Sequence, residues 1–222
     1  MAGSTVTGSG NAAKTPGLRR ALEAVHLTAS GVWTGVLVMA GGSAAVLFPK
    51  MQSLRPRLPA YDEYGGEHWR LAAGIVQNEV FKIADVAQFA LATLCLASLL
   101  GLLVFAGLPT RRLSTGVRIV LLCVAMSLTS YHLFILGPRM QATAELYWSA
   151  AEAGDDEAAN RARSAFNDDH PAASRVLGGT ALATLALTVA GVWSAVPAGD
   201  LRRGSVRKPV AAEEPALARG RA

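Results

Sequence analysis

Charged residues are scarce in this chain, and their scarcity argues against a soluble fold. Only 17% of the 222 residues are charged, whereas 51% are hydrophobic, which is too apolar for an average soluble domain. The hydrophobic residues also occur in long blocks, and buried helices of soluble proteins rarely run so far without a charge. The composition therefore favours a membrane protein over a soluble all-α protein.

Motifs of soluble enzymes are missing as well. The sequence contains no phosphate-binding glycine loop, no zinc-protease helix and no nucleophile elbow. Its two cysteines, Cys95 and Cys123, lie inside apolar runs, where a reduced structural thiol is the usual state. We therefore expect a protein that is not an enzyme. Its net charge of +5 fits basic tails beside anionic lipid, so no nucleic-acid partner is expected.

Four apolar runs are long enough to cross a bilayer, whose hydrocarbon core of roughly 30 Å needs about 20 helical residues. They cover residues 21–48, 86–108, 117–137 and 176–197. They predict an all-α membrane domain over residues 21–197, with four transmembrane helices in contact with the lipid bilayer. Residues 1–20 and 198–222 have the polar, Gly- or Arg-rich composition of disordered tails.

Two long links join these runs, and both are expected to contain helix. In residues 49–85, Pro49 is expected to end the first helix, whereas the chain from Glu67 onward is typical of a helix leading into the second span.

In the second long link, residues 138–175, Gly154 is expected to stop a helix, and Asp155 or Asp156 can cap the next one. A further helix is expected to begin just before Pro171, because a capping acid followed by proline is typical of a first turn.

Basic residues predict the orientation in the membrane. The two tails and the short connection around Arg112 hold twelve of the 21 lysines and arginines, while the two long links hold twelve of the 16 acids. Basic residues in short segments stay in the cytoplasm. We therefore expect a multi-pass protein of the cell (inner) membrane, with both termini cytoplasmic and both long links outside.

The sequence also contains a weak internal repeat. Pro49-Lys50-Met51-Gln52 resembles Pro138-Arg139-Met140-Gln141 at an offset of 89, and residues 90–94 repeat at 181–185 with an offset of 91. Both copies begin and end on the inner side, so the pattern predicts a duplicated parallel repeat of two hairpins. The two prolines are expected at equivalent outer ends of the first and third helices.

A stripe of small residues marks the first run. Gly31, Gly35 and Gly42 keep helical spacing over three turns. Such a stripe lets a second helix approach closely in lipid, so we expect this face to pack against another helix, although an Ala- and Gly-rich composition would also produce it.

Ionisable residues inside spans are costly and are candidates for function. An inner group comprises Glu23, His26 and Arg118, and an outer group contains His132 and Asp85, with Gln88 beside them. We predict that His132 faces the bundle interior and forms a hydrogen bond with another helix, most directly with Asp85. We expect this bond to be purely structural, and a pair that binds a cation or passes a proton is the alternative.

The candidate metal ligands do not form one site in the sequence. His132, His170 and Asp85 are the outer candidates, and His26 is the inner one. His26 and His132 differ by 17 residues in their distance to the following proline, or about 25 Å along a helix. One metal ion or haem iron cannot bind both, so a metal- or haem-handling redox protein, with haem or copper, remains only the alternative to a non-enzymatic protein.

Several short motifs resemble known membrane families. Residues 25–27 (Val-His-Leu), 32–35 (Val-Trp-Thr-Gly) and 47–49 (Leu-Phe-Pro), with Pro138-Arg139 and Phe166…His170, resemble the transmembrane-protein-205-like family over about residues 20–197. The resemblance implies a four-helix membrane domain, and a homo-oligomer or a membrane-protein partner is compatible with it. The opening motif is also similar to CopD and HemJ-type domains, which implies a metal or haem bound by histidine in the membrane; only His26 matches that motif.

Overall fold

The computed structural model describes residues 16–195, and in this part of the chain the fold is made of long helices. They are α1 (Pro16–Leu54), α2 (His68–Val104), α3 (Leu113–Tyr131), α4 (Gly137–Glu152) and α5 (Asp156–Ala195), with the short 3-10 helix η1 (Pro59–Tyr61) and the π-helical turn η2 (His132–Leu136). The turn η2 joins α3 and α4 into one rod, so the predicted all-α fold with four apolar, membrane-length helices is confirmed. The predicted tails lie largely outside the described residues, but α1 already begins at Pro16, within the expected N-terminal tail.

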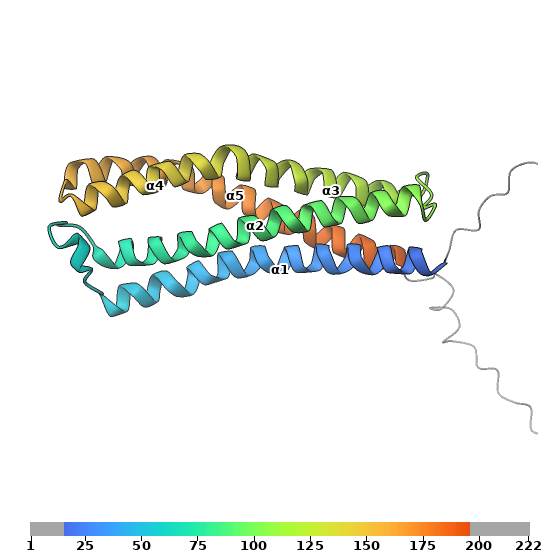
Figure 1. Cartoon of the computed structure of the whole chain (residues 1–222), viewed down its shortest axis with the longest axis horizontal. Helices are drawn as coiled ribbons and strands as arrows, with labels where there is room; N and C mark the ends of the chain where they lie inside the picture. The colour runs from blue at the N-terminus through green and yellow to red at the C-terminus, as the bar shows by residue number, and fades with distance from the viewer. Residues whose placement is uncertain (1–15, 196–222) are drawn as a thin grey trace, which may run out of the picture.

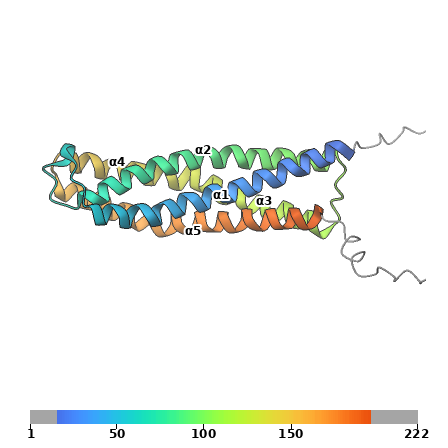
Figure 2. The same ribbon diagram turned by 90° about the horizontal axis from the view of Figure 1, so that it is seen from below.

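The four rods form two antiparallel hairpins that lie side by side (Figures 1 and 2). The first hairpin is α1 with α2, and the second is the α3–η2–α4 rod with α5. Helix α5 also packs against α1, whereas α2 and α3 make few contacts. Pro16, Ala195 and the loop between α2 and α3 lie together at one end, called the inner end below, and the other two turns lie at the outer end.

The rods are longer than a bilayer is thick. Each has 37 to 40 residues, or about 55–60 Å of helix, against a hydrocarbon core of roughly 30 Å. Large apolar side chains cover the outside of the bundle, including Val86 (73% exposed), Leu182 (70%) and Trp193 (81%). A soluble protein rarely exposes so large an apolar surface, so the chain is an integral, multi-pass membrane protein.

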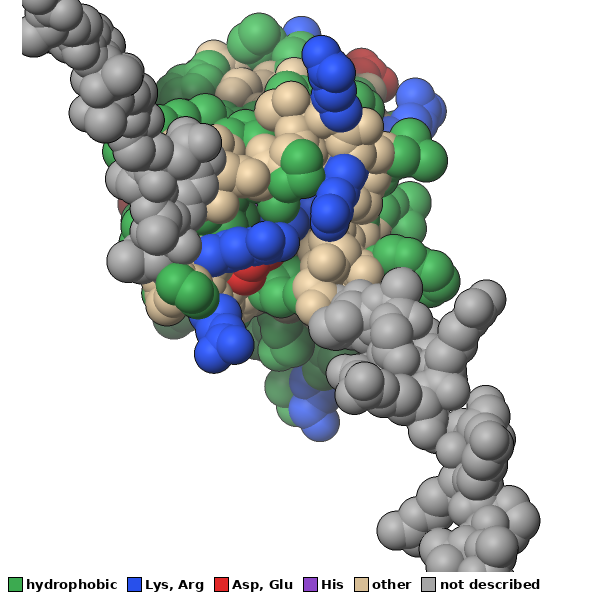
Figure 3. Space-filling view, turned by 90° about the vertical axis from the view of Figure 1, so that its right-hand side faces the viewer, with side chains coloured by type: hydrophobic (Ala, Val, Ile, Leu, Met, Phe, Trp, Pro, Cys, Tyr) green, Lys and Arg blue, Asp and Glu red, His purple; other side chains and the backbone are tan. Residues whose placement is uncertain are grey.

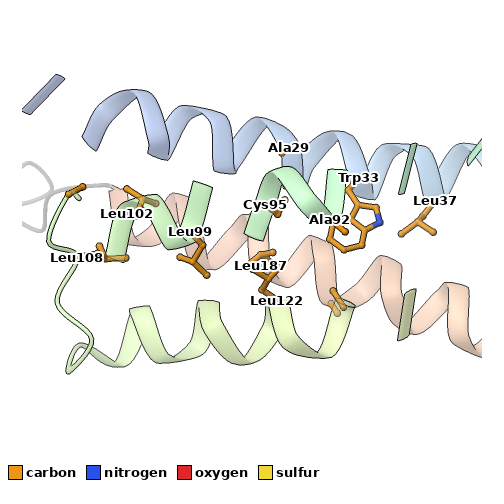
Figure 4. Close-up of a cluster of buried hydrophobic side chains, with 13 residues drawn as sticks. Ala29, Trp33, Leu37, Ala92, Cys95, Leu99, Leu102, Leu108, Leu122 and Leu187 are labelled. Atoms are coloured by element: carbon orange, nitrogen blue, oxygen red, sulfur yellow. The ribbon is translucent and has the colours of Figure 1, made fainter. Parts of the chain in front are cut away.

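Two apolar clusters hold the rods together. The larger one lies in the inner part of the bundle and joins all four rods (Figure 4), with Trp33 on α1, Cys95 on α2, Leu122 on α3 and Leu187 on α5.

The smaller cluster lies at the outer end, and its centre is a pair of tyrosines. The hydroxyl oxygens of Tyr64 and Tyr147 are 3.1 Å apart, and their rings meet edge to face. Burial, together with the nearby Glu152 carboxylate, raises the pKa of the adjacent Tyr61. The cluster therefore connects the loop of the first hairpin to α4 and α5.

The prolines do not end helices as the sequence suggested. Helix α1 continues through Pro49 to Leu54, and α5 runs without a break through Pro171. A proline removes one helical hydrogen bond. Near Pro49 and Pro171 the helix surfaces are largely exposed, so water outside the lipid can satisfy the freed carbonyl groups. The expected helix end at Pro49 and helix start before Pro171 are therefore wrong, and the internal repeat stays a prediction.

Pro138 has a different effect, because it follows the π-helical turn η2. Its ring would clash with the carbonyl group four residues earlier, and a turn widened by one residue relieves such a clash. The Gly137 N–H donates to the carbonyl oxygen of His132, five residues back. A Cβ atom at Gly137 would lie only 2.9 Å from that oxygen, so this position requires glycine.

Other local predictions can now be compared with the structure. Gly154 ends α4 with a positive φ of 72°. Asp155 accepts a hydrogen bond from the Ala158 N–H at 2.9 Å. The predicted helix end at Gly154 and the predicted cap at Asp155 are therefore confirmed. The prediction that the glycine stripe of α1 packs against another helix is mostly wrong, because nothing lies within 4 Å of a Cβ built on Gly35 or Gly42.

Replacing Gly137 by alanine should destabilise the protein by about 1–3 kcal/mol, the usual cost of forcing an extra methyl group into a packed site. Thermal unfolding in detergent measures the change. Gly178→Ala is the matched control, because a Cβ there meets no atom within 4 Å, and alanine in a helix interior is favoured over glycine. Equal stability of the two variants would show that the π-helical turn does not depend on Gly137.

Candidate functional site

Polar side chains meet at two places inside the bundle, one toward each end. The outer centre consists of Asp85 and Gln88 on α2, Thr129 on α3 and His132 at the start of η2. The inner centre consists of Glu23 and His26 on α1, Ser98 on α2 and Arg118 on α3.

The outer centre is built around the carboxylate of Asp85. His132 Nε2 donates to Asp85 Oδ1 at 3.2 Å, and Gln88 Nε2 donates to the same oxygen at 3.1 Å. His132 is 6% exposed and faces the bundle interior, while the Asp85 side chain is 29% exposed. The predicted contact between His132 and Asp85 is therefore confirmed.

The remaining polar atoms of the outer centre have no partner among the described residues. They are His132 Nδ1, Gln88 Oε1 and Thr129 Oγ1, and all three are buried. With Nε2–H directed at Asp85, Nδ1 is an acceptor. The centre therefore offers a carboxylate, two further acceptors and a hydroxyl group, which can take up a proton or a small polar species.

The inner centre is built around a bidentate ion pair. Arg118 donates from Nη1 to Glu23 Oε1 at 3.2 Å and from Nη2 to Glu23 Oε2 at 2.9 Å. The Arg118 side chain is fully buried, and that of Glu23 is 14% exposed. A bidentate pair of this kind is among the stronger polar contacts in proteins, so it fixes α3 against α1 near the inner end.

His26 completes the inner centre and is itself fully buried. Its Nδ1–H donates to the Cys95 carbonyl oxygen at 3.2 Å and lies equally close to Ser98 Oγ. This bond fixes the tautomer, so Nε2 is left as an acceptor without a partner among the described residues. The arrangement resembles the support that metal-binding histidines receive from a backbone carbonyl.

The two centres are well separated. Arg118 and His132 are fourteen residues apart on the same rod, or about 21 Å. Leu122 and Ala125 lie between them on α3, both almost fully buried in the large apolar cluster. The expectation that His26 and His132 cannot share one metal ion agrees with this spacing.

The candidate metal ligands therefore belong to three different places. His132 and Asp85 are together in the outer centre, and His26 is in the inner centre. His170 lies outside both, on α5, with its ring 5.9 Å from that of Phe166. No group of three or more His, Cys, Asp or Glu side chains arranged to hold a metal occurs within residues 16–195.

Hydroxyl and amide contacts between helices were not predicted from the sequence. Ser43 and Gln77 connect α1 with α2 at 3.2 Å, and Thr34 and Thr184 connect α1 with α5 at 3.0 Å. Serine and threonine are common in such spans and often bond their own helix. Only the register of two helices shows which of them face each other.

Removing one partner of the inner ion pair should be costly. Arg118→Met leaves the Glu23 carboxylate unpaired, and we expect a loss of about 3–5 kcal/mol in the free energy of unfolding. The double variant Glu23→Gln/Arg118→Met should lose less, because no charge is then left unpaired. Unfolding in detergent gives both values.

The exposed pair of Arg161 and Glu157 is the control for the inner ion pair. Glu157→Gln should change stability by no more than about 0.5 kcal/mol. A double variant of the inner pair as unstable as Arg118→Met would show that the loss in Arg118→Met does not come from an unpaired Glu23 carboxylate.

Comparison with known proteins gives no relative from which a role could be transferred. No family model matches the chain, and no curated protein or solved structure is significantly similar to it. The function must therefore be argued from the two polar centres and from the way in which they connect the helices.

Proposed function

We propose that this chain is a non-enzymatic, multi-pass protein of the cell membrane in which the outer centre exchanges a proton or a small cation with the exterior. The inner pair of Glu23 and Arg118 then acts as a fixed connection between the hairpins. The outer pair of Asp85 and His132 is the responsive connection, because its carboxylate is partly exposed and its imidazole keeps an acceptor nitrogen without a partner, whereas Arg118 is fully buried.

One observation carries this proposal: both ion pairs connect the first hairpin to the second. Glu23 on α1 bonds Arg118 on α3, and Asp85 on α2 bonds His132 at the end of α3. Helices α2 and α3 make few other contacts. A change in protonation at the outer pair therefore acts on the seam where the two hairpins are least tightly packed.

The charge distribution supports the proposed orientation. Pro16, Ala195 and the loop between α2 and α3 share the inner end (Figure 1), and basic side chains gather on that end face (Figure 3). Basic residues next to spans are retained in the cytoplasm. The polar parts of α4 and α5 and the outer tyrosine cluster then face the exterior, and the outer centre lies on the exterior side.

Membership of the transmembrane-protein-205-like family belongs to the same proposal. The motifs on which the resemblance rests occupy defined places: His26 is in the inner centre, Trp33 is in the large apolar cluster and Pro138 follows the π-helical turn. A homo-oligomer or another membrane protein remains compatible with the apolar outer surface.

A metal- or haem-handling protein is the second candidate, and one observation favours it. The buried Nε2 of His26 has no partner, while Nδ1 is fixed by the Cys95 carbonyl. A single ligand holds haem or copper weakly, and His132 is too far away to be the second one. An absorption spectrum of the purified protein tests this candidate, because bound haem gives a Soret band.

The proposed orientation can be measured with reporter fusions. A reporter joined after Ala222 should be active in the cytoplasm, and one inserted at Gly154 in the outer turn should be active outside. The reason is the excess of basic residues around the inner end. A C-terminal reporter that is active only outside would overturn the orientation.

The responsive role of the outer pair can be measured with spin labels. Labels at Ile83 and Ile135, which are 72% and 57% exposed, report the separation of α2 from the second hairpin near the outer centre. Asp85→Asn removes the charged acceptor of His132, so the distance distribution should broaden or lengthen. The Asp85 carboxylate binds a protonated imidazole more strongly than a neutral one. Lowering the pH in the protein that retains Asp85 should therefore narrow or shorten the distance distribution, and Asp85→Asn should lose this response.

A second pair of labels serves as the control for that experiment. Phe105 and Leu113, which are 66% and 85% exposed, flank the inner loop, and their separation should not change in Asp85→Asn. If the outer distance is insensitive both to pH and to Asp85→Asn, the outer pair is purely structural and the proposed exchange is wrong.

A further inference from the structure

Polar side chains from all four rods form a layer that includes the inner side of the outer centre. Trp33 is on α1, Gln88 on α2, Thr129 on α3 and Thr180 and Thr184 on α5, and each is no more than 3% exposed. Below, this set is called the polar layer. It lies at a depth where polar groups are costly unless they have a partner.

Contacts between the helices place these residues at one level. On α1 and α2, the bonds from His26 to Ser98 and from Ser43 to Gln77 mark two matching positions. Trp33 and Gln88 each lie somewhat less than halfway from the inner to the outer bond on their own helices. They are therefore neighbours in depth.

The other two rods reach the same level. Thr129 lies one turn inward from His132, as Gln88 lies one turn inward from Asp85, so the bond between His132 and Asp85 brings Gln88 and Thr129 to matching depths. Helix α5 reaches this level as well, because Thr184 accepts a hydrogen bond from Thr34, the residue next to Trp33.

Four of the seven buried side-chain atoms without a partner among the described residues lie in and beside this layer. They are Trp33 Nε1, Gln88 Oε1, Thr129 Oγ1 and His132 Nδ1, and together they comprise a pure donor, two acceptors and a hydroxyl group. In Figure 4 the indole nitrogen of Trp33 points toward Leu37, which is the outer direction, and so toward the level of Gln88. Buried polar atoms of this kind are normally satisfied by ordered water.

A groove runs beside the layer, on the seam between α2 and α3. It has a volume of about 60 Å³ and is lined by the buried Thr129 and Ala92 and by the exposed Phe89 and Phe134, so it opens on the surface of the bundle. A single water needs roughly 10–15 Å³ by the same measure, so the groove has room for a water against the Thr129 hydroxyl group.

We propose that the polar layer is a hydrated half-channel for protons, open to the exterior through the outer centre and closed toward the cytoplasm. Water bound to Trp33, Gln88 and Thr129 continues the hydrogen-bonded network of the outer centre inward, so a proton that hydronium delivers to Asp85 or His132 is shared with this water. Apolar side chains form the dry barrier between this water and the inner centre, all no more than 3% exposed: Cys95, Leu122, Ala125 and Leu187. The proton part of this inference rests on the proposed exchange at the outer pair, whereas the hydration does not.

The emission of Trp33 tests the hydration. The full chain carries Trp69, Trp148 and Trp193 in addition, so these three are replaced by phenylalanine and the protein is measured in nanodiscs. An indole hydrogen-bonded to water emits a broad band at longer wavelength, and a dry indole emits a structured band at shorter wavelength. We expect the broad band, and we expect a shift to shorter wavelength when Gln88→Leu and Thr129→Val are combined.

Leu99→Val, farther inward in the large apolar cluster, is the matched control and should leave the Trp33 band unchanged. A structured short-wavelength band in the parent protein, unaffected by Gln88→Leu and Thr129→Val, would overturn the half-channel. The wild-type fold of each variant is checked by its elution as a single species and by its helical circular dichroism, so that a shift caused by unfolding is recognised.

A pH series on the same single-tryptophan protein separates the two proposals. We expect the Trp33 band to shift on acidification and the shift to vanish in His132→Gln. A broad band that is insensitive to pH would overturn the proton path and the proposed exchange at the outer pair, while the hydration alone would stand. A dry band with a pH-dependent separation of the spin labels would overturn the half-channel and leave the proposed exchange intact.

Discussion

A bilayer offers no water to a polar side chain, and this constraint decides where each ionisable residue of this protein can lie. Glu23 and Arg118 meet each other, and Asp85 meets His132. Neither pair could form within one hairpin, because each needs a residue from the α3–η2–α4 rod and one from the first hairpin. The requirement for a partner therefore does more than neutralise charge: it sets the register between two hairpins whose apolar surfaces would otherwise slide past each other in lipid.

The two pairs differ in how firmly they hold. The inner pair is bidentate, Arg118 is fully buried, and an arginine stays protonated at any physiological pH. The outer pair depends on one hydrogen bond to a carboxylate that is 29% exposed, and it adjoins a π-helical turn. Such turns occur often at functional sites. An input from outside would therefore act on the outer half first, with the inner pair as the fixed end.

The sequence was sufficient to predict features that depend on the length of an apolar run or on the depth of a residue in the membrane. Four runs of about 20 apolar residues predict spans, and antiparallel neighbours that enter from the same side place Asp85 opposite His132. It was insufficient for features that depend on which faces of two helices pack against each other. The stripe of Gly31, Gly35 and Gly42 has the spacing of a packing face, yet Gly35 and Gly42 face outward. Pro49 lies at the end of an apolar run but not at the end of its helix, because composition changes at the lipid boundary and the helix continues beyond it.

The same reasoning explains why the polar layer could not be recognised in the sequence. A tryptophan, a glutamine and scattered threonines on four helices carry no common motif, and each alone is an ordinary residue for a membrane span. These residues form a layer only because they lie at the same depth in the bundle, and that depth is set by the bonds that fix α1 against α2 and α2 against η2. Once those bonds are known, the interior divides into a polar outer level, a dry middle formed by Leu122 and Leu187, and an ion pair at the inner end. A pore through the whole bundle would need polar groups at every level, so this order favours access from the outer end alone.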